Sequence, residues 1–150
     1  MADIVDKATR SRMMAGIRGR DTRPELELRR ALHALGFRFR LQSKDLPGRP
    51  DILLPGRRAA IFVHGCFWHR HRGCRFSTTP ATRREFWNEK FAANLARDER
   101  NTAALRALGW RVAIVWECAL RAADRAESAN AVAQWLRSSE AELEIGAAQV

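Results

Sequence analysis

The sequence predicts one α/β domain in which a mixed β-sheet is flanked by helices. Three observations lead to this prediction: a capped helical stretch near the start, three short apolar strands in close succession, and a long helical stretch before a fourth apolar strand. The chain has 150 residues, 46% of them hydrophobic, which suits one compact domain and excludes wholesale disorder. We divide it into a basic arm at 1–20, a domain at 21–137 and a frayed tail at 138–150.

The first helix is expected to begin at Thr22. The segment Thr22-Arg-Pro-Glu25 has the pattern of a capping box, with a proline in the first turn. Leucine and alanine recur behind it at helical spacing as far as Gly36, which ends the helix.

Three short strands follow this helix. Residues 37–41 alternate as in a half-buried strand, whereas 51–54 and 59–63 are apolar and are joined by a turn at 55–58. Because the connections are short, we expect an antiparallel meander.

An irregular loop and a long helix come next. Residues 64–79 combine His, Cys, Gly and aromatic residues without periodicity, and a helix is expected to begin at Thr79-Pro80. The face of this helix expected to be buried carries Trp87, Phe91, Leu95, Thr102 and Leu105. The helix permits a right-handed crossover to a parallel fourth strand at 110–116, and a last helix is expected over about 120–137. The order αβββαβ is that of restriction-endonuclease-like nucleases, whose active site lies on the second and third strands.

The charge of the chain favours a polyanionic partner. Lys and Arg total 27 against 17 Asp and Glu, giving a net charge of +10 and a pI near 11.2. A protein with this positive charge attracts nucleic acid. The alternative explanation is that a GC-rich coding sequence has made the chain rich in arginine. No apolar run suffices for a membrane span and no secretory segment is evident, so we expect a soluble, cytoplasmic protein.

Asp51 and His64 are the first candidates for catalysis. Asp51 opens one strand, where its carboxylate could bind Mg²⁺, and His64 follows the end of the next strand. In the nuclease fold named above, the strand that ends at this point normally supplies an acid, one spacer and a lysine. This chain has Phe62-Val-His64 there, which argues against a generic restriction enzyme.

Four residues are candidate zinc ligands: Cys66, His71, Cys74 and Cys118. Their type and short spacing are typical of structural zinc sites. The alternative is three ordinary buried thiols. Separately, His69 could accept a proton from water if a carboxylate such as Glu25 orients it, while Glu25 could serve only as a helix cap.

Residues 1–120 resemble the very short patch repair endonuclease family. The matching segments are Asp6-Lys-Ala-Thr-Arg-Ser11, Arg20-Asp-Thr22, Leu46-Pro-Gly-Arg-Pro-Asp51, His64-Gly-Cys-Phe-Trp-His69, Ala81-Thr-Arg83, Glu85-Phe-Trp87, Gly109-Trp-Arg-Val112 and Val115-Trp-Glu-Cys-Ala-Leu120. Family members cleave the T strand 5′ of the thymine in a T·G mismatch that arises when 5-methylcytosine deaminates. The resemblance therefore implies a DNA nicking enzyme that initiates repair.

The resemblance also implies roles for single residues. Asp51 and the main-chain carbonyl of Val63 would bind Mg²⁺, His69 oriented by Glu25 would activate water, and His64 would contact the scissile phosphate. The four zinc ligands would be Cys66, His71, Cys74 and Cys118. The loop at 70–73 is one residue longer than in the family, so the match to the family pattern is least direct at His71. The residues that would contact DNA are Phe67, Trp68 and Trp87 from the major groove, and Met14, Arg10 and Arg20 on the arm.

We expect a monomer that acts on double-stranded DNA, with mismatch-repair proteins as further partners. One alternative is a restriction-type enzyme that cuts both strands. Another is a zinc-stabilised DNA-binding module without catalysis, which a lone carboxylate repelling phosphate disfavours.

Overall fold

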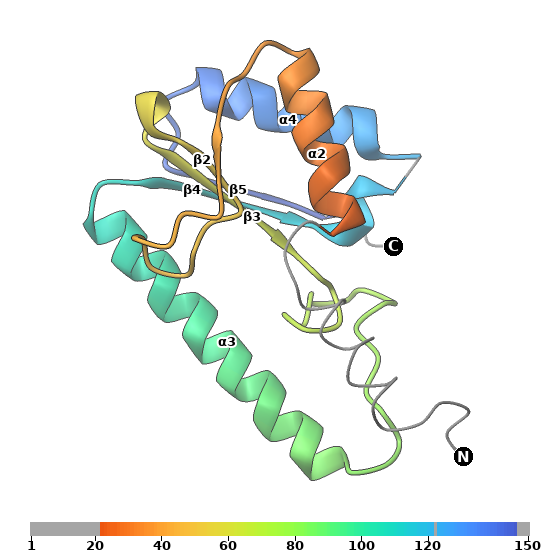
Figure 1. Cartoon of the computed structure of the whole chain (residues 1–150). Helices are drawn as coiled ribbons and strands as arrows, with labels where there is room; N and C mark the ends of the chain where they lie inside the picture. Colours follow the sequence, from red (N-terminus) through yellow and green to blue (C-terminus); the bar gives the residue numbers. More distant parts are fainter. Residues whose placement is uncertain (1–21, 122, 147–150) are drawn as a thin grey trace.

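The computed structural model describes residues 22–121 and 123–146 (Figure 1). The expectations for the arm, with Arg10, Met14 and Arg20, lie outside the described residues. Five strands form one sheet in the order β1-β2-β3-β4-β5. Their bounds are Arg40–Leu41 for β1, Ile52–Leu54 for β2, Ala59–His64 for β3, Arg111–Trp116 for β4 and Glu142–Ile145 for β5.

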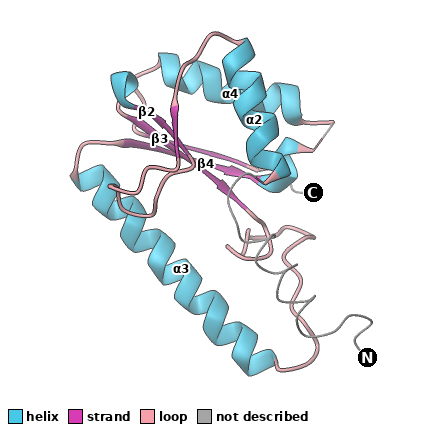
Figure 2. Cartoon of the chain, viewed as in Figure 1, coloured by secondary structure: helices cyan, strands magenta, loops and turns pink. Residues whose placement is uncertain are grey.

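The strand directions confirm the predicted meander and crossover. The pairs β1–β2 and β2–β3 are antiparallel, whereas β3–β4 and β4–β5 are parallel. Because it contains both kinds of pairing, the sheet is mixed. A helix connects β3 to β4, and the fold is of the α/β class (Figure 2).

Within the described part of the chain, three helices cover the two faces of this sheet. Helix α2 spans Arg23–Ala34, α3 spans Arg84–Ala107 and α4 spans Arg125–Arg137, with short 3₁₀ turns η1 at Pro55–Arg57 and η2 at Glu117–Leu120. Helices α2 and α4 lie on one face and α3 lies on the other (Figure 1).

Side chains of β3 alternate between the two faces, as in any buried strand. Ile61 belongs to the core beneath α2 and α4, whereas Ala60 and Phe62 pack against Leu105 of α3. The strand thus carries His64, two residues beyond Phe62, to the face that α3 covers.

The predicted start of the first helix is confirmed. The Thr22 hydroxyl accepts a hydrogen bond from the Glu25 N–H at 3.4 Å, and a proline occupies the first turn. The helix ends at Ala34 with Leu35 as its C-cap, and Gly36 then adopts a φ of 96° that favours glycine. The cap fixes the first turn of α2 and therefore the position from which the Glu25 side chain projects.

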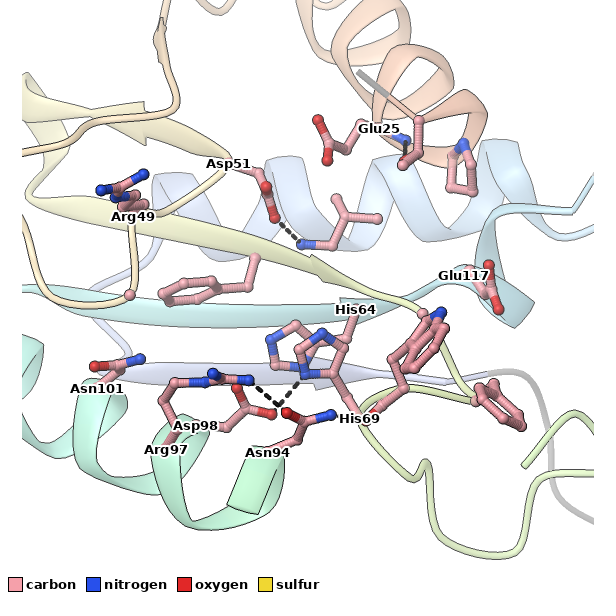
Figure 3. Close-up of a pocket in the computed structure, with 18 of the residues that line it drawn as sticks. Glu25, Arg49, Asp51, His64, His69, Asn94, Arg97, Asp98, Asn101 and Glu117 are labelled. Atoms are coloured by element: carbon pink, nitrogen blue, oxygen red, sulfur yellow. Dashed lines mark hydrogen bonds and ion pairs between the residues drawn. The ribbon is translucent and has the colours of Figure 1, made fainter. Parts of the chain in front are cut away.

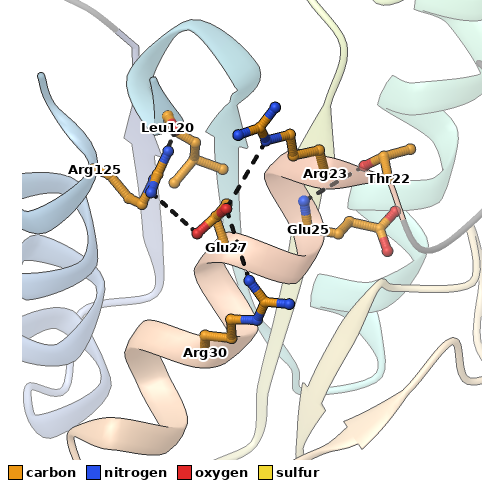
Figure 4. A network of polar contacts seen from close by, with 7 residues as sticks. All are labelled: Thr22, Arg23, Glu25, Glu27, Arg30, Leu120 and Arg125. Carbon is orange, nitrogen blue, oxygen red and sulfur yellow. Dashed lines mark hydrogen bonds and ion pairs between the residues drawn. The ribbon is translucent and has the colours of Figure 1, made fainter. Parts of the chain in front are cut away.

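An ion pair connects α2 to α4 (Figure 4). The Glu27 carboxylate lies 3.1 Å from the Arg125 guanidinium, which also donates to the Leu120 carbonyl at 3.3 Å. These contacts join α2, η2 and α4 on the same face of the sheet.

The structure corrects three of the predicted boundaries. The strand expected at 37–41 is reduced to two residues, because Phe37 turns into the core beneath α2 and α4. Helix α3 begins at Arg84 and not at Thr79-Pro80, because Arg83 has a left-handed backbone with a φ of 54°. Phe91 and Leu105 are buried as predicted, but Leu95 is 43% exposed. The last helix begins at residue 125, after the turn η2.

The expected frayed tail is wrong for residues 142–145, which form strand β5. Leu143 and Ile145 pack against the core and alternate with exposed glutamates, which gives the period of a half-buried strand. The Arg111 guanidinium donates to the carbonyls of Ser138, at 2.9 Å, and Glu140, also at 2.9 Å, and so fastens the segment that leads into β5.

No helix within the described residues has both the length and the apolarity needed to cross a membrane.

The loop between β1 and β2 requires glycine at residue 48. Gly48 has a φ of 76°, and a Cβ atom there would lie 3.0 Å from Cβ of Asn101 and 3.1 Å from the Phe62 ring. The loop is therefore in close contact with α3 just before Asp51.

Gly48→Ala should lower the free energy of unfolding by about 1–3 kcal/mol, the usual cost of a non-glycine residue in a left-handed conformation. Gly56→Ala is the matched control, since Gly56 has neither a positive φ nor an atom within 4 Å of its added Cβ. Denaturant titration of both variants checks this, and equal stability of the two would contradict it.

Candidate active site

A pocket of about 1520 Å³ opens where β3 ends. Residues from α2, from the start of β2, from the loop after β3 and from the middle of α3 line it (Figure 3). The predicted candidates Glu25, Asp51, His64 and His69 all line this one pocket. The fold thus brings together residues that lie up to 44 positions apart in the sequence.

Asp51 is held beside the main chain of β3. One of its carboxylate oxygens accepts a hydrogen bond from the Val63 N–H at 2.7 Å. Burial, followed by the negative charge of Glu25, raises the pKa of Asp51 to about 7, although the bond from Val63 opposes this. The carboxylate therefore sits where a cation would be stabilised.

Glu25 supplies an acidic side chain to the site, where β3 has none. Its side chain is buried, and it lies close enough to Asp51 for the charge of one carboxylate to act on the other. The Arg29 guanidinium donates to it at 2.8 Å, and the Gln42 amide donates at 3.4 Å. A second acid thus reaches the site from α2 and not from the strand, where the usual pattern would have placed it.

The expected pairing of Glu25 with His69 is corrected by the structure. Nδ1 of His69 lies 2.6 Å from a carboxylate oxygen of Asp98, on α3, and Glu25 belongs to the Asp51 side of the pocket (Figure 3). With Nδ1 occupied in this way, Nε2 is the ring nitrogen that remains to exchange a proton.

Asp98 is a candidate site residue that the sequence reasoning missed. It lies on α3 four residues after Asn94 and three before Asn101, and all three line the pocket. Polar residues at this spacing form a stripe along one helix face, between the buried Phe91 and Leu105. That stripe was the signal available in the sequence.

His64 is buried and stacked on His69. The ring centroids are 3.9 Å apart with the planes 6° from parallel, and the Trp116 ring meets His64 edge-on at 5.2 Å. Burial, aided by His69, lowers the pKa of His64 to about 3, although Asp98 opposes this. His64 is therefore neutral at physiological pH and can exchange hydrogen bonds without adding charge.

The stacked rings argue against a metal site at His64, His69 and Asp98, although their ligand atoms lie within 4.8 Å of one another. The lone pair of an imidazole nitrogen lies in the ring plane, so two nearly parallel rings cannot both point at one ion. The arrangement favours proton transfer over metal binding.

A second group does have the form of a metal site. Ligand atoms of Cys66, His71, Cys74 and Cys118 lie within 4.8 Å of one another and could hold a metal ion. Nδ1 of His71 is 3.7 Å from Sγ of Cys66 and 3.4 Å from Sγ of Cys118, and none of the three cysteines forms a disulfide. Three thiols and one imidazole are the ligand set of a closed structural zinc site.

Burial also raises the pKa of the Cys66 thiol, so a thiolate at this position would need a nearby cation to stabilise it. The chemistry of the donor set therefore fits zinc. His71 joins this group despite the longer loop, in which Arg70 and Gly73 adopt positive φ angles of 55° and 70°.

Hydrogen bonds fasten the loop that carries these ligands. The Glu117 carboxylate accepts from the Cys66 N–H at 3.1 Å, and the Ser77 hydroxyl donates to the carbonyls of Cys66, at 2.7 Å, and His71, at 2.8 Å. The loop is thus tied to η2 and to itself on both sides of the metal ligands.

An aromatic cluster lies beside the pocket, formed by Phe67 and Trp68 of the loop and Trp87 and Phe91 of α3. The ring centroids of Phe67 and Trp68 are 5.0 Å apart, and Trp68 and Trp87 are 5.8 Å apart. The Asn94 amide donates to the Trp68 carbonyl at 3.1 Å. Phe67, Trp68 and Trp87 are half-buried, so each keeps some accessible surface.

The pocket has a basic rim. Five cations line it together with the catalytic candidates: Arg23, Lys44, Arg49, Lys90 and Arg97. A basic rim around two neighbouring carboxylates suits a phosphate backbone that approaches bound metal.

One zinc ion per chain should purify with the protein, and His71→Ala should lose most of it. His33→Ala is the matched control, because His33 is exposed at the end of α2 and lies outside the metal group. Elemental analysis of both variants checks this. Folded wild-type protein without zinc would refute the assignment.

Comparison with known proteins identifies the family. Residues 2–75 match the family model described as "DNA mismatch endonuclease Vsr". The chain is 52% identical over 120 residues to "Type II nicking enzyme V.XorIIP" of Xanthomonas oryzae pv. oryzae, covering 80% of this chain and 88% of that one. It is also 52% identical over 125 residues to "DNA mismatch endonuclease Vsr" of Escherichia coli, covering 83% and 80%. A third relative, "Type II nicking enzyme V.NmeAIP" of Neisseria meningitidis serogroup A, is 39% identical over 81% and 86%. The chain belongs to the Vsr family of DNA mismatch endonucleases.

Proposed function

We propose that this protein nicks one strand of duplex DNA at a T·G mismatch, on the 5′ side of the thymine, and so initiates very short patch repair. The observation that carries the proposal is the convergence of the Asp51–Glu25 pair, the His69–Asp98 pair and the aromatic cluster on one pocket. The relatives named above, which include a mismatch endonuclease and nicking enzymes, support DNA as the substrate and cleavage of one strand.

The Asp51 carboxylate and the Val63 carbonyl are the groups we expect to hold Mg²⁺, with Glu25 close by. A bound Mg²⁺ ion supplies positive charge to the scissile phosphate and to its attacking water. Oxygen donors at a buried, negatively charged site suit this hard cation. The element order αβββαβ supports a restriction-endonuclease-like core in which Glu25 replaces the acid missing from β3.

His69 is the residue we expect to remove a proton from water. Nδ1–H donates to Asp98 and fixes the tautomer, so Nε2 carries the lone pair that accepts the proton. The positive imidazolium that results is stabilised by the Asp98 carboxylate. His64, neutral and stacked on His69, is placed to hydrogen-bond the phosphate without competing for that proton.

The aromatic cluster is expected to insert between base pairs at the mismatch. Unstacking a base step costs a few kcal/mol, and less at a deformable wobble pair than at a T·A pair. This difference in the cost of unstacking would favour binding at the T·G mismatch over binding at a T·A pair. Trp68 and His69 are neighbours in the chain, so insertion and catalysis would occur side by side.

Several further features belong to this proposal. We expect zinc at the Cys₃His group with a structural role, a monomer as the active species, a cytoplasmic location and mismatch-repair proteins as partners. A restriction-type enzyme that cuts both strands would linearise supercoiled plasmid without a mismatch, whereas the proposed enzyme would leave it uncut.

End-labelled duplexes that differ only in a T·G or a T·A pair test the function directly. We expect a Mg²⁺-dependent nick on the T strand of the T·G duplex alone. Equal cleavage of both duplexes would reject the mismatch assignment, and cleavage of both strands would reject nicking.

Asp51→Asn should abolish nicking and preserve binding to the T·G duplex, because phosphate contacts come mainly from the basic side chains. Asp45→Asn removes an exposed carboxylate from the preceding loop and should retain full activity. Nicking and gel-shift assays on both variants check this, and Mg²⁺-dependent cleavage by Asp51→Asn at the wild-type rate would exclude the metal role.

Asp98→Asn should lower the nicking rate on the order of 10²-fold with little change in binding, since the base loses the carboxylate that fixes its tautomer. Glu99→Gln, next to it on the exposed side of α3, is the matched control. Single-turnover kinetics distinguish the two steps. An unaltered rate in Asp98→Asn would show that the pair has no catalytic role.

Trp68→Ala should weaken binding to T·G DNA more than to matched DNA, because only the mismatched site gains from the inserted ring. Arg10→Ala on the arm should weaken both to a similar extent, as expected of a phosphate contact. Equal losses on the two duplexes for Trp68→Ala would mean that the ring serves packing only.

A further inference from the structure

The end of β5 covers one edge of the predicted metal ligand His71. A Cβ atom added to Gly146 would lie 2.6 Å from both Cε1 and Nε2 of the His71 ring. Gly146 has no positive φ, so the close contact with the ring, and not the backbone conformation, requires glycine here. The main chain after β5 is therefore in contact with the side of the imidazole that faces away from the thiols.

Trp116 covers a face of the same ring. The two ring centroids are 4.3 Å apart and the planes are 9° from parallel. Trp116 is held in turn by β5, because its Nε1–H donates to the Glu144 carboxylate at 3.0 Å. His71 is thus enclosed on one face by Trp116 and along one edge by Gly146, with Nδ1 directed at the thiols of Cys66 and Cys118.

Strand β5 is anchored independently of the metal ligands. It pairs in parallel with β4, with Leu143 opposite Ala113 and Ile145 opposite Val115, and both of its apolar side chains pack on the core. The stability of the enclosure around His71 therefore depends on the packing of β5 against β4 and the core.

We propose that β5 and the residue that follows it, through the positioning residues Glu144 and Gly146, form the outer wall of the Cys₃His group and determine how long the group retains its metal. Second-sphere contacts fix the orientation of a ligating imidazole, and the loss of such contacts weakens metal binding. The inference rests on the proposed zinc site and not on DNA cleavage. It assigns a metal-retaining role to a strand far along the chain from the loop at 66–74.

Zinc release tests this proposal. Wild-type and variant proteins purified with zinc are mixed with excess chromophoric chelator under native conditions, and the release rate is followed by absorbance. Gly146→Ala should release zinc about 10–100-fold faster than the wild type, which corresponds to the loss of metal affinity that second-sphere substitutions typically cause. Gly56→Ala, where an added Cβ meets nothing within 4 Å, should release it at the wild-type rate.

Glu144 gives an independent variant on an exposed position, in case Gly146→Ala does not fold. Glu144→Ala removes the acceptor for Trp116 and should accelerate release, whereas Glu144→Gln keeps an acceptor and should restore slow release. With Co²⁺ in place of zinc, the visible d–d bands should shift in Gly146→Ala, which a stability effect alone would not cause.

Wild-type release rates and unshifted Co²⁺ bands in folded Gly146→Ala, or equal rates in Glu144→Ala and Glu144→Gln, would overturn the proposal. Wild-type protein that holds no zinc would overturn the zinc site itself. Neither readout uses DNA, so failure of the proposed nicking activity would be detected separately.

Discussion

The closure of the loop between β3 and α3 by Cys66, His71, Cys74 and Cys118 is the constraint on which the site depends. Residues 65–83 contain no helix or strand, so regular backbone hydrogen bonds do not fix their path. The contacts within the Cys₃His group, the Glu117 and Ser77 hydrogen bonds and the contacts with α3 do so instead. Without these contacts, a loop of this length would lose considerable conformational entropy each time it positioned an aromatic side chain or the catalytic histidine correctly.

Helix α3 is the second support of the same loop. Its residues Asn94 and Asp98 hold Trp68 by the main chain and His69 by the side chain, so two consecutive residues with different roles are fastened to one rigid element. The other half of the site is independent of the loop, because β2 and the capped start of α2 supply Asp51 and Glu25. Burial, and after it the negative charge of Glu25, raises the pKa of Asp51, and two neighbouring carboxylates of this kind favour a bound cation.

Much of the fold could be predicted because local chemistry decided it. The Thr22 cap, the meander and the parallel fourth strand follow from short-range patterns. Strand β5 was missed because its two apolar residues, Leu143 and Ile145, lie between glutamates in a short segment, and only packing on β4 makes it a strand. The partners of Glu25 and His69 could not be predicted, since spacing along the chain says nothing about which carboxylate meets which imidazole. Asp98 reaches the site only because α3 crosses the end of β3.

The most direct test of this account is the relation between zinc content and nicking. Zinc is removed stepwise with a chelator, the chelator is removed, and excess Mg²⁺ is restored before cleavage of a T·G duplex is measured. We predict that the rate per chain falls in proportion to the zinc lost and recovers when zinc is returned, because the loop that carries Trp68 and His69 is no longer closed without it. Zinc-free protein that keeps its circular dichroism spectrum and nicks at the full rate would contradict the account.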